Sequence, residues 1–183
     1  MSNLAPKPSI DPGIFRAYDI RGITTQNLTE QVVYWIGRSF ATAALAENQS
    51  TAVVGRDGRL SSPGLEKALT GGLCDGGMDV ISVGLVPTPV LYFATHALQT
   101  GTGIMITGSH NPPEYNGLKM MMAGGAMYGD QIQALYQRIV ADDFAQGEGW
   151  ALLDYDDKDL PVEVRKRIAE DGGPEAVLLK LLP

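Results

Sequence analysis

The sequence predicts an α/β protein: a three-layer α/β/α sandwich with a mixed, mostly parallel sheet and a short helical C-terminal tail. The alternation of two kinds of segment along the chain predicts this fold. Short apolar segments alternate along the chain with longer segments whose apolar residues recur at helical spacing. Such alternation implies crossover connections, which cover both faces of a parallel sheet with helices. The 183 residues, 44% of them hydrophobic and 19% charged, are enough for one compact domain with a short appendage.

The first expected elements are a helix and a buried strand. Thr29 can cap a helix from Glu30 to about Leu45, because its hydroxyl can accept a hydrogen bond from the first helical turn. The apolar residues of this segment form one stripe, as in a helix that packs on a core. Residues 51–55, Thr-Ala-Val-Val-Gly, fit a short strand that ends in the polar loop 56–59.

A second helix and a second strand follow this loop. Ser61 or Ser62 is expected to cap the helix, because Pro63 suits the first helical turn. The helix is expected to end near Cys74. Residues 79–83, Asp-Val-Ile-Ser-Val, have the composition of a strand.

The remaining elements of the body are two helices and two strands. One helix is expected over residues 88–97, opened by two prolines, and Asp130 is expected to cap another that ends near Val140. Strands are expected over residues 103–107 and 118–122. The connection between these strands is too short for a crossover helix, so the second should run antiparallel to the first.

Composition excludes several classes of protein. The formal net charge is −7, which argues against nucleic-acid binding through bulk charge. No apolar run is long enough to span a membrane, and the N-terminus lacks the pattern of a secretory signal. Cys74, the single cysteine, excludes an internal disulfide and a cysteine-based metal site. These features predict a cytoplasmic location, and Cys74 and His96 are interpreted as packing residues.

The most informative segment is 107–119, which leaves the carboxyl end of an expected strand, where open α/β sheets build their ligand sites. Gly108 is expected to let the backbone turn sharply so that the next residue points outward. Two prolines then stiffen the loop. The segment gathers a hydroxyl, an imidazole, two amides and an amine, from Ser109, His110, Asn111, Asn116 and Lys119.

The same segment allows a plainer interpretation, because glycine, serine, asparagine and proline are ordinary turn residues. A Gly-x-Ser-x-Gly elbow is absent, which disfavours a serine hydrolase. Neither a Walker A motif nor a dinucleotide-binding glycine pattern occurs. Lys119 is the only lysine or arginine between Lys67 and Arg138, so it is expected to stand by itself beside the hydroxyl of Ser109.

Two further segments add polar residues. Residues 14–22 place Arg21 near the start of the chain, where its guanidinium fork suits a bidentate contact to phosphate. Residues 54–59 again follow an expected strand, and Arg56 and Asp57 are interpreted there as an ion-paired loop.

Four segments together carry a family resemblance: FRAYDIRG, VGRDGRLS, GLVPTPVLYFA and TGSHNPPEYNGLK. In this order and spacing they resemble the first domain of the α-D-phosphohexomutase family, and most closely its bacterial phosphomannomutase/phosphoglucomutase members. The resemblance covers about residues 14–140. It implies the α/β/α fold already expected, and the interconversion of hexose 1-phosphate and hexose 6-phosphate of mannose or glucose.

The resemblance implies that Ser109 is the serine that is phosphorylated in the resting enzyme and donates its phosphoryl group to a hexose phosphate substrate. The hexose 1,6-bisphosphate formed in this way returns its other phosphoryl group to the serine. His110 and Asn111 match residues that shape the loop and contact the transferring group.

The remaining matches lie outside this turn. Lys119 matches a residue that helps proton transfer with the sugar hydroxyl, with Arg21 beside it. Tyr18 matches an aromatic residue near the substrate. The resemblance also implies Mg²⁺, bound through the phosphate on Ser109, but the carboxylate loop that completes the metal site in the family does not occur in this chain.

A domain boundary is expected within residues 147–157, where glycine, aspartate and a few apolar residues mix without a period, and the family pattern does not continue from about residue 150. Residues 1–147 are therefore assigned to the phosphoserine domain, and residues 148–183 to a linker and a helical tail, two short helices broken at Gly172-Gly173, that do not match the family. The isolated chain is expected to be inactive, because the family's metal and sugar loops are missing. The alternative is a non-catalytic scaffold, truncated or engineered, with a structural or sugar-phosphate-binding role. The sequence predicts neither the preferred sugar nor the oligomeric state.

Overall fold

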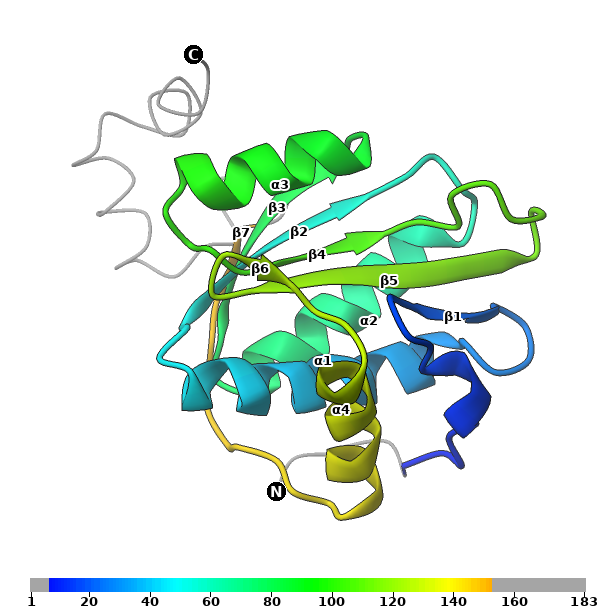
Figure 1. The fold of residues 1–183 in the computed structure, drawn as a ribbon, viewed down its shortest axis with the longest axis horizontal. Helices are drawn as coiled ribbons and strands as arrows, with labels where there is room; N and C mark the ends of the chain where they lie inside the picture. The colour runs from blue at the N-terminus through cyan, green and yellow to red at the C-terminus, as the bar shows by residue number, and fades with distance from the viewer. Residues whose placement is uncertain (1–6, 153–183) are drawn as a thin grey trace.

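The computed structural model of the protein describes residues 7–152, and Figure 1 shows a sheet between layers of helices. Along the chain, the elements are η1 (Pro12–Ile14), β1 (Ile20–Ile23), α1 (Glu30–Ala46), β2 (Thr51–Arg56), α2 (Ser62–Asp75), β3 (Asp79–Leu85), α3 (Thr88–Ala97), β4 (Gly103–Ile106), β5 (Tyr115–Met122), β6 (Gly125–Ala126), α4 (Asp130–Val140) and β7 (Ala151–Leu152). None of these helices is long and apolar enough to cross a membrane.

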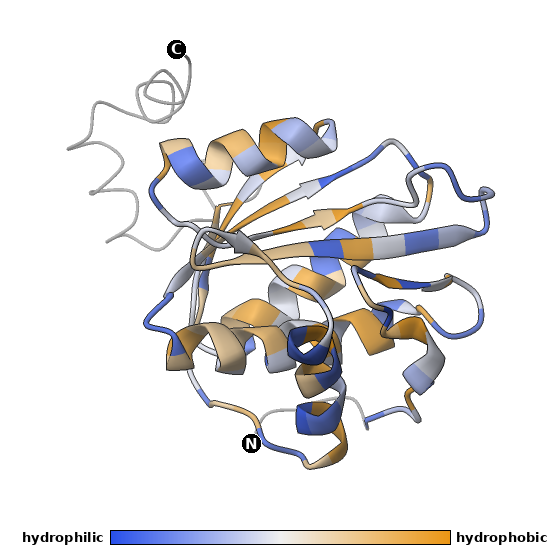
Figure 2. Ribbon diagram, viewed as in Figure 1, coloured by the Kyte–Doolittle hydropathy of each residue, from blue (hydrophilic) through white to orange (hydrophobic). Residues whose placement is uncertain are grey.

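The architecture is the expected three-layer α/β/α sandwich. Helices α1, α2 and α4 cover one face of the sheet and α3 covers the other (Figure 1). Neighbouring residues of a strand point to opposite faces, so Val54 joins the larger core with α1, α2 and α4, whereas Val53 joins a smaller core with α3. Figure 2 shows that hydrophobic residues concentrate in the central strands, while the loops at their ends are mostly hydrophilic.

The sheet is mixed, with strand order β1-β5-β4-β2-β3-β7, and β6 pairs with β5. Its centre is parallel, because β4, β2, β3 and β7 run in one direction. The expected antiparallel pairing of β5 with β4 is confirmed by the register from Gly103↔Met121 to Ile106↔Leu118. The sequence did not indicate β1, a four-residue strand that pairs antiparallel with the start of β5.

Of the expected helix caps, Thr29 is confirmed, Ser61 takes its position without a capping hydrogen bond, and Asp130 is wrong. Thr29 caps α1 as predicted, since its hydroxyl accepts a hydrogen bond from the Val32 amide at 3.3 Å. Ser61 occupies the cap position of α2 but has a helical backbone and makes no capping bond. The Ser62 hydroxyl instead donates to Asp57 Oδ1 at 2.7 Å, so this serine joins a loop to the helix. Asp130 is the first residue of α4, and Gly129 occupies its cap position.

The chain continues the sheet beyond the expected domain boundary. Ala151 and Leu152 form β7, which pairs with Val80 and Ile81 of β3. The boundary after residue 147 stays a prediction. The helices expected in the tail lie outside the described residues.

Helices α1 and α2 approach each other closely at glycines. A Cβ atom on Gly72 would lie 2.1 Å from the backbone oxygen of Tyr34, and one on Gly37 would lie 2.6 Å from that of Leu69. Both obstacles are backbone atoms, which cannot rotate away. The neighbouring Gly71 is different, because its Cβ would meet only the ring of Tyr34, at 3.8 Å.

We expect Gly72→Ala to lower the melting temperature and Gly71→Ala to leave it unchanged or raise it. Both changes gain roughly 1 kcal/mol of helix propensity. Only Gly72→Ala also forces the two helices apart, an overpacking that typically costs about 1–3 kcal/mol. Thermal melts followed by circular dichroism compare the two variants directly. Equal melting temperatures for the two would contradict the close packing of α1 on α2.

Candidate functional site

The loops that follow β2 and β4 meet at one edge of the sheet. These strands are parallel neighbours, so their carboxyl ends lie together. Residues 57–61 connect β2 to α2, and residues 107–114 connect β4 to β5. Both loops lie on the right of Figure 1, where Figure 2 shows mostly hydrophilic residues.

Ser109 lies exposed at the turn of the second loop, in the left-handed region with φ of 52°. Its amide donates to the Thr107 hydroxyl at 2.9 Å. The turn is closed by Asn111, whose amide and side-chain nitrogen both donate to the carbonyl of Gly108, at 2.9 and 2.8 Å. The Ser109 hydroxyl oxygen lies 3.5 Å from Nδ1 of His110, so these side chains are neighbours on the exposed side of the loop.

The bend comes from a different residue than expected. Gly108 does not have a positive φ; Ser109 does. Glycine at 108 is instead required by a close approach, since a Cβ there would lie 2.1 Å from Nε of Arg59.

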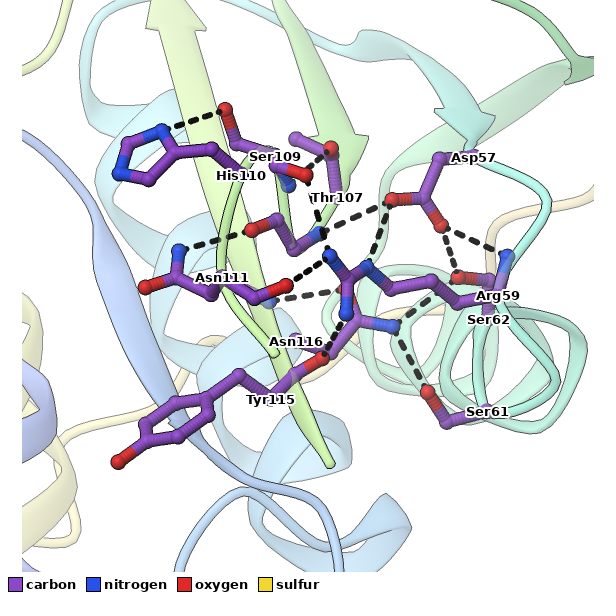
Figure 3. A network of polar contacts seen from close by, with 12 residues as sticks. Asp57, Arg59, Ser61, Ser62, Thr107, Ser109, His110, Asn111, Tyr115 and Asn116 are labelled. Atoms are coloured by element: carbon purple, nitrogen blue, oxygen red, sulfur yellow. Dashed lines mark hydrogen bonds and ion pairs between the residues drawn. The ribbon is translucent and has the colours of Figure 1, made fainter. Parts of the chain in front are cut away.

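Arg59 lies beneath this loop and donates to four of its backbone carbonyls (Figure 3). The bonds are 3.1 Å to Ser109, 2.7 Å to Asn111, 2.7 Å to Pro112 and 3.0 Å to Tyr115. One guanidinium thus joins both sides of the loop. A planar fork with five donors suits this task, and a lysine ammonium does not.

Asp57 completes the contact between the two loops. One carboxylate oxygen accepts from the amide of Gly108 at 3.0 Å and lies 3.3 Å from Nε of Arg59. The other accepts from the Ser62 hydroxyl at 2.7 Å and the Arg59 amide at 3.1 Å. Burial acts to raise the pKa of Asp57, but the hydrogen bonds from Ser62, Arg59, Gly108 and Thr107 outweigh it and hold the pKa below its ordinary value.

The expected ion pairing in this region has different partners. Arg56 does not pair with Asp57; its Nε lies 2.8 Å from Glu66 Oε2, on α2. Asp57 pairs with Arg59. Adjacent residues of an extended segment point in opposite directions, which explains why each found a separate partner.

A second polar cluster lies on β1 and β5. Asp19, only 7% exposed, lies 2.7 Å from Nη2 of Arg21 and 3.8 Å from Nζ of Lys119. The expectation that Lys119 stands by itself is therefore wrong, because it lies close to Asp19. Arg21 also reaches Asn111 of the 107–114 loop, with Nη1 3.4 Å from its Oδ1. Tyr18, next to Asp19, is 78% exposed.

The structure thus brings together most of the sequence candidates, although their chemical roles stay predictions. Asn111 connects the Ser109 turn to Arg21, and Asp19 connects Arg21 to Lys119. Sequence reasoning missed Asp19 and Arg59, and it placed Asp57 in an ion-paired loop without its contact to Gly108. Asp19 lies in the same segment as Arg21, FRAYDIRG, and this proximity in sequence could have indicated it. For Arg59 the four bonds are to backbone, and no residue pattern encodes them.

Cys74 and His96, the two residues interpreted as packing residues, differ in how far they are buried. Cys74 is partly buried, and burial, with the negative charges of Asp75 and Asp79, raises the pKa of its thiol to about 11. The thiol is therefore protonated at neutral pH. His96, in the last turn of α3, is exposed, so its expected packing role is wrong.

Three comparisons with known proteins agree on one family. Residues 12–146 match the family model for phosphoglucomutase/phosphomannomutase, alpha/beta/alpha domain I. A phosphomannomutase/phosphoglucomutase of Pseudomonas aeruginosa is 51% identical over 145 residues, which are 79% of this chain and 31% of that protein. A phosphoglucomutase of Neisseria gonorrhoeae is 47% identical over 140 residues, covering 76% of this chain and 30% of that protein.

Solved structures give the same result. A phosphoglucomutase/phosphomannomutase family protein from Burkholderia thailandensis superposes with a TM-score of 0.76 at 49% identity, covering 79% of this chain and 33% of that one. A protein from Thermus thermophilus described as a putative phosphomannomutase gives a TM-score of 0.66 at 29% identity. The chain spans about a third of the length of the relatives it matches.

The lowered pKa of Asp57 predicts a pH-dependent stability. Its ionised carboxylate stabilises the fold fully above about pH 5, and this contribution is lost as pH falls below the ordinary value of 3.8 and through the folded pKa. Asp57→Asn should therefore unfold at lower urea concentration than the parent at pH 7, and the difference should shrink below pH 4. Glu114→Gln, which removes an exposed carboxylate of the same loop, serves as control. A difference that stays constant with pH would refute the role of Asp57.

Proposed function

This chain belongs to the phosphoglucomutase/phosphomannomutase family, and we propose that Ser109 is the residue through which a phosphoryl group passes between hexose 1-phosphate and hexose 6-phosphate. The relatives are phosphomannomutases and phosphoglucomutases. Since the chain spans about a third of their length, its part in that activity is a proposal.

The observation that carries the proposal is the presentation of Ser109. Its hydroxyl lies exposed on a loop whose backbone is held by bonds from another loop. Phosphoryl transfer needs positioning and charge neutralisation more than covalent chemistry from the protein. A fixed, exposed hydroxyl near cationic side chains fits that need.

In the proposed reaction, the bond between phosphorus and the Ser109 oxygen breaks as a free hydroxyl of a hexose monophosphate forms its own bond to phosphorus. The proton of this hydroxyl passes to the Ser109 oxygen that the phosphoryl group leaves, and the product is a hexose 1,6-bisphosphate. The other phosphoryl group of that sugar then passes to Ser109, leaving the isomeric monophosphate. The serine is thus regenerated in its phosphorylated form.

The cluster on β1 and β5 supplies the charges for these steps. Arg21 is proposed to contact the transferring phosphoryl group, because its guanidinium already reaches Asn111 of the loop. Lys119 is proposed to help move the proton of the sugar hydroxyl. Asp19 holds both side chains. His110 and the exposed Tyr18 are proposed to contact phosphate and sugar respectively.

The described residues do not fit a magnesium site. Within residues 7–152, no three histidine, cysteine, aspartate or glutamate side chains lie close enough together to hold a metal ion. Asp57, the carboxylate of the loop network, is already engaged by Gly108, Ser62 and Arg59. Carboxylate ligands for Mg²⁺ would have to come from elsewhere, and no step above depends on the metal.

The alternative is a domain that binds sugar phosphates or supports an assembly without catalysis. The observation that favours it is the short span of the chain relative to its relatives. The two functions differ in whether Ser109 is needed for turnover.

We expect the 183-residue chain alone to have negligible mutase activity on glucose 1-phosphate or mannose 1-phosphate. The expected reason is that one domain provides neither the metal ligands nor a complete sugar site. A coupled assay with magnesium and glucose 1,6-bisphosphate measures this. Turnover close to that of the Pseudomonas aeruginosa relative would contradict it.

A chimera tests the catalytic proposal. Residues 12–146 replace the corresponding domain of the Pseudomonas aeruginosa relative, with which this chain is 51% identical over 145 residues. We expect the chimera to interconvert the two glucose phosphates, and Ser109→Ala to lower kcat by at least about 10³-fold because no phosphoryl acceptor remains. Ser50→Ala is the control, since Ser50 is exposed and precedes β2 at the opposite edge of the sheet. A folded Ser109→Ala chimera with full activity would favour the scaffold.

A further inference from the structure

We propose that Asp57 and Arg59 are positioning residues for phosphoryl transfer at Ser109. They hold the 108–115 loop, which is the β4–β5 connection from Gly108 together with the first residue of β5, in the conformation that presents the serine hydroxyl. This inference rests on the proposed function of Ser109. It assigns a role to two residues of the β2–α2 loop whose hydrogen bonds to residues 108–115 go to backbone atoms.

The first argument is the reach of Arg59. Its four carbonyl acceptors extend from Ser109 to Tyr115, so both ends of the loop depend on one side chain. The Arg59 side chain is 17% exposed, and the four carbonyls would lose their partner if the guanidinium were removed. A backbone carbonyl that has no hydrogen-bond partner and is partly shielded from water lowers the stability of the conformation that holds it there. The loop would therefore rearrange if the guanidinium were removed.

The second argument is the conformation of Ser109. A non-glycine residue at φ of 52° carries a cost of order 1 kcal/mol, and it persists only where its surroundings impose it. The contacts that impose it lie on both sides of the residue. Arg59 holds the carbonyl of Ser109, and Asp57 holds the amide of Gly108.

The third argument is charge. Arg59 has a formal positive charge close to the proposed phosphoryl acceptor, but it is paired with Asp57 at 3.3 Å and its donors are directed to carbonyls. A guanidinium occupied in this way is not free to bind the phosphoryl group itself. Its contribution is to fix the loop, which leaves Arg21 and Lys119 as the cations of the second cluster.

The packing of Arg59 on the backbone of Gly108 gives independent support for the proposal. A Cβ there would lie 2.1 Å from Nε and 2.2 Å from Cζ of Arg59. The guanidinium thus packs directly on the backbone of the residue that precedes Ser109. Any side chain at 108 would displace it.

Amide hydrogen exchange of the full chain, measured residue by residue by NMR, tests the proposal. Arg59→Lys keeps the charge but cannot reach four carbonyls, and we expect exchange at Ser109, Asn111 and Tyr115 to rise at least about tenfold. Amides of α1 and α4 should match those of the control Arg56→Lys, since the guanidinium of Arg56 is directed to Glu66 of α2. In Arg59→Ala, added guanidinium ion should restore protection of the loop, which a general loss of stability would not allow.

Gly108→Ala keeps the test decisive if Arg59→Lys fails to fold. It displaces the guanidinium without changing charge, whereas the control Gly125→Ala meets only the Met122 carbonyl at 3.8 Å. We expect faster loop exchange in Gly108→Ala alone. Loop exchange equal to the control in either pair of variants would overturn the proposal.

Kinetics of the chimera separate positioning from simple stability. Arg59→Lys should lower kcat by roughly 10²-fold, because a small misplacement of a reacting group has an effect of that size, while KM stays within about threefold. Unchanged kcat would overturn the proposal. An inactive parent chimera would contradict the proposed function instead, and the exchange data, which need no phosphate or sugar, would still decide the role of Arg59.

Discussion

The antiparallel pairing of β5 with β4 on one side and β1 on the other fixes where Arg21 and Lys119 lie, and it brings the two ends of the Ser109 loop together. The pairing with β4 sets Lys119 opposite Met105, and the pairing with β1 sets Arg21 opposite Gly117. The 107–114 connection therefore starts and ends at the same edge of the sheet. A shift of one residue in either register would turn Arg21 or Lys119 to the other face.

Two polar networks build on this frame. Asp19 gathers Arg21 and Lys119 beside the sheet edge, and the β2–α2 loop supports the Ser109 turn from below. Asn111 belongs to both, because it closes the turn through Gly108 and approaches Arg21. The helices contribute indirectly: Ser62 at the start of α2 anchors Asp57, and Gly72 lets α1 and α2 pack closely beneath the sheet.

The sequence predicted the elements that have a strong local signal. The stripe after Thr29 predicted α1, and the short link between 107 and 118 predicted an antiparallel strand. It did not predict β1, because four residues are too few to show a period and the strand exists through pairing with β5. The contacts of Asp57 and Arg59 with the 107–114 loop could not be predicted for a similar reason. Their partners lie some fifty positions away and are mostly backbone atoms, which carry no residue-specific pattern.

The central claim is that Ser109 accepts the phosphoryl group, and mapping the phosphate tests it most directly. The chimera is incubated with glucose 1,6-bisphosphate and magnesium, digested, and analysed by tandem mass spectrometry. The account predicts one phosphate, located on Ser109, and none in the Ser109→Ala variant. Phosphate on a different residue of an active chimera, or turnover with an unmodified and unnecessary Ser109, would contradict it.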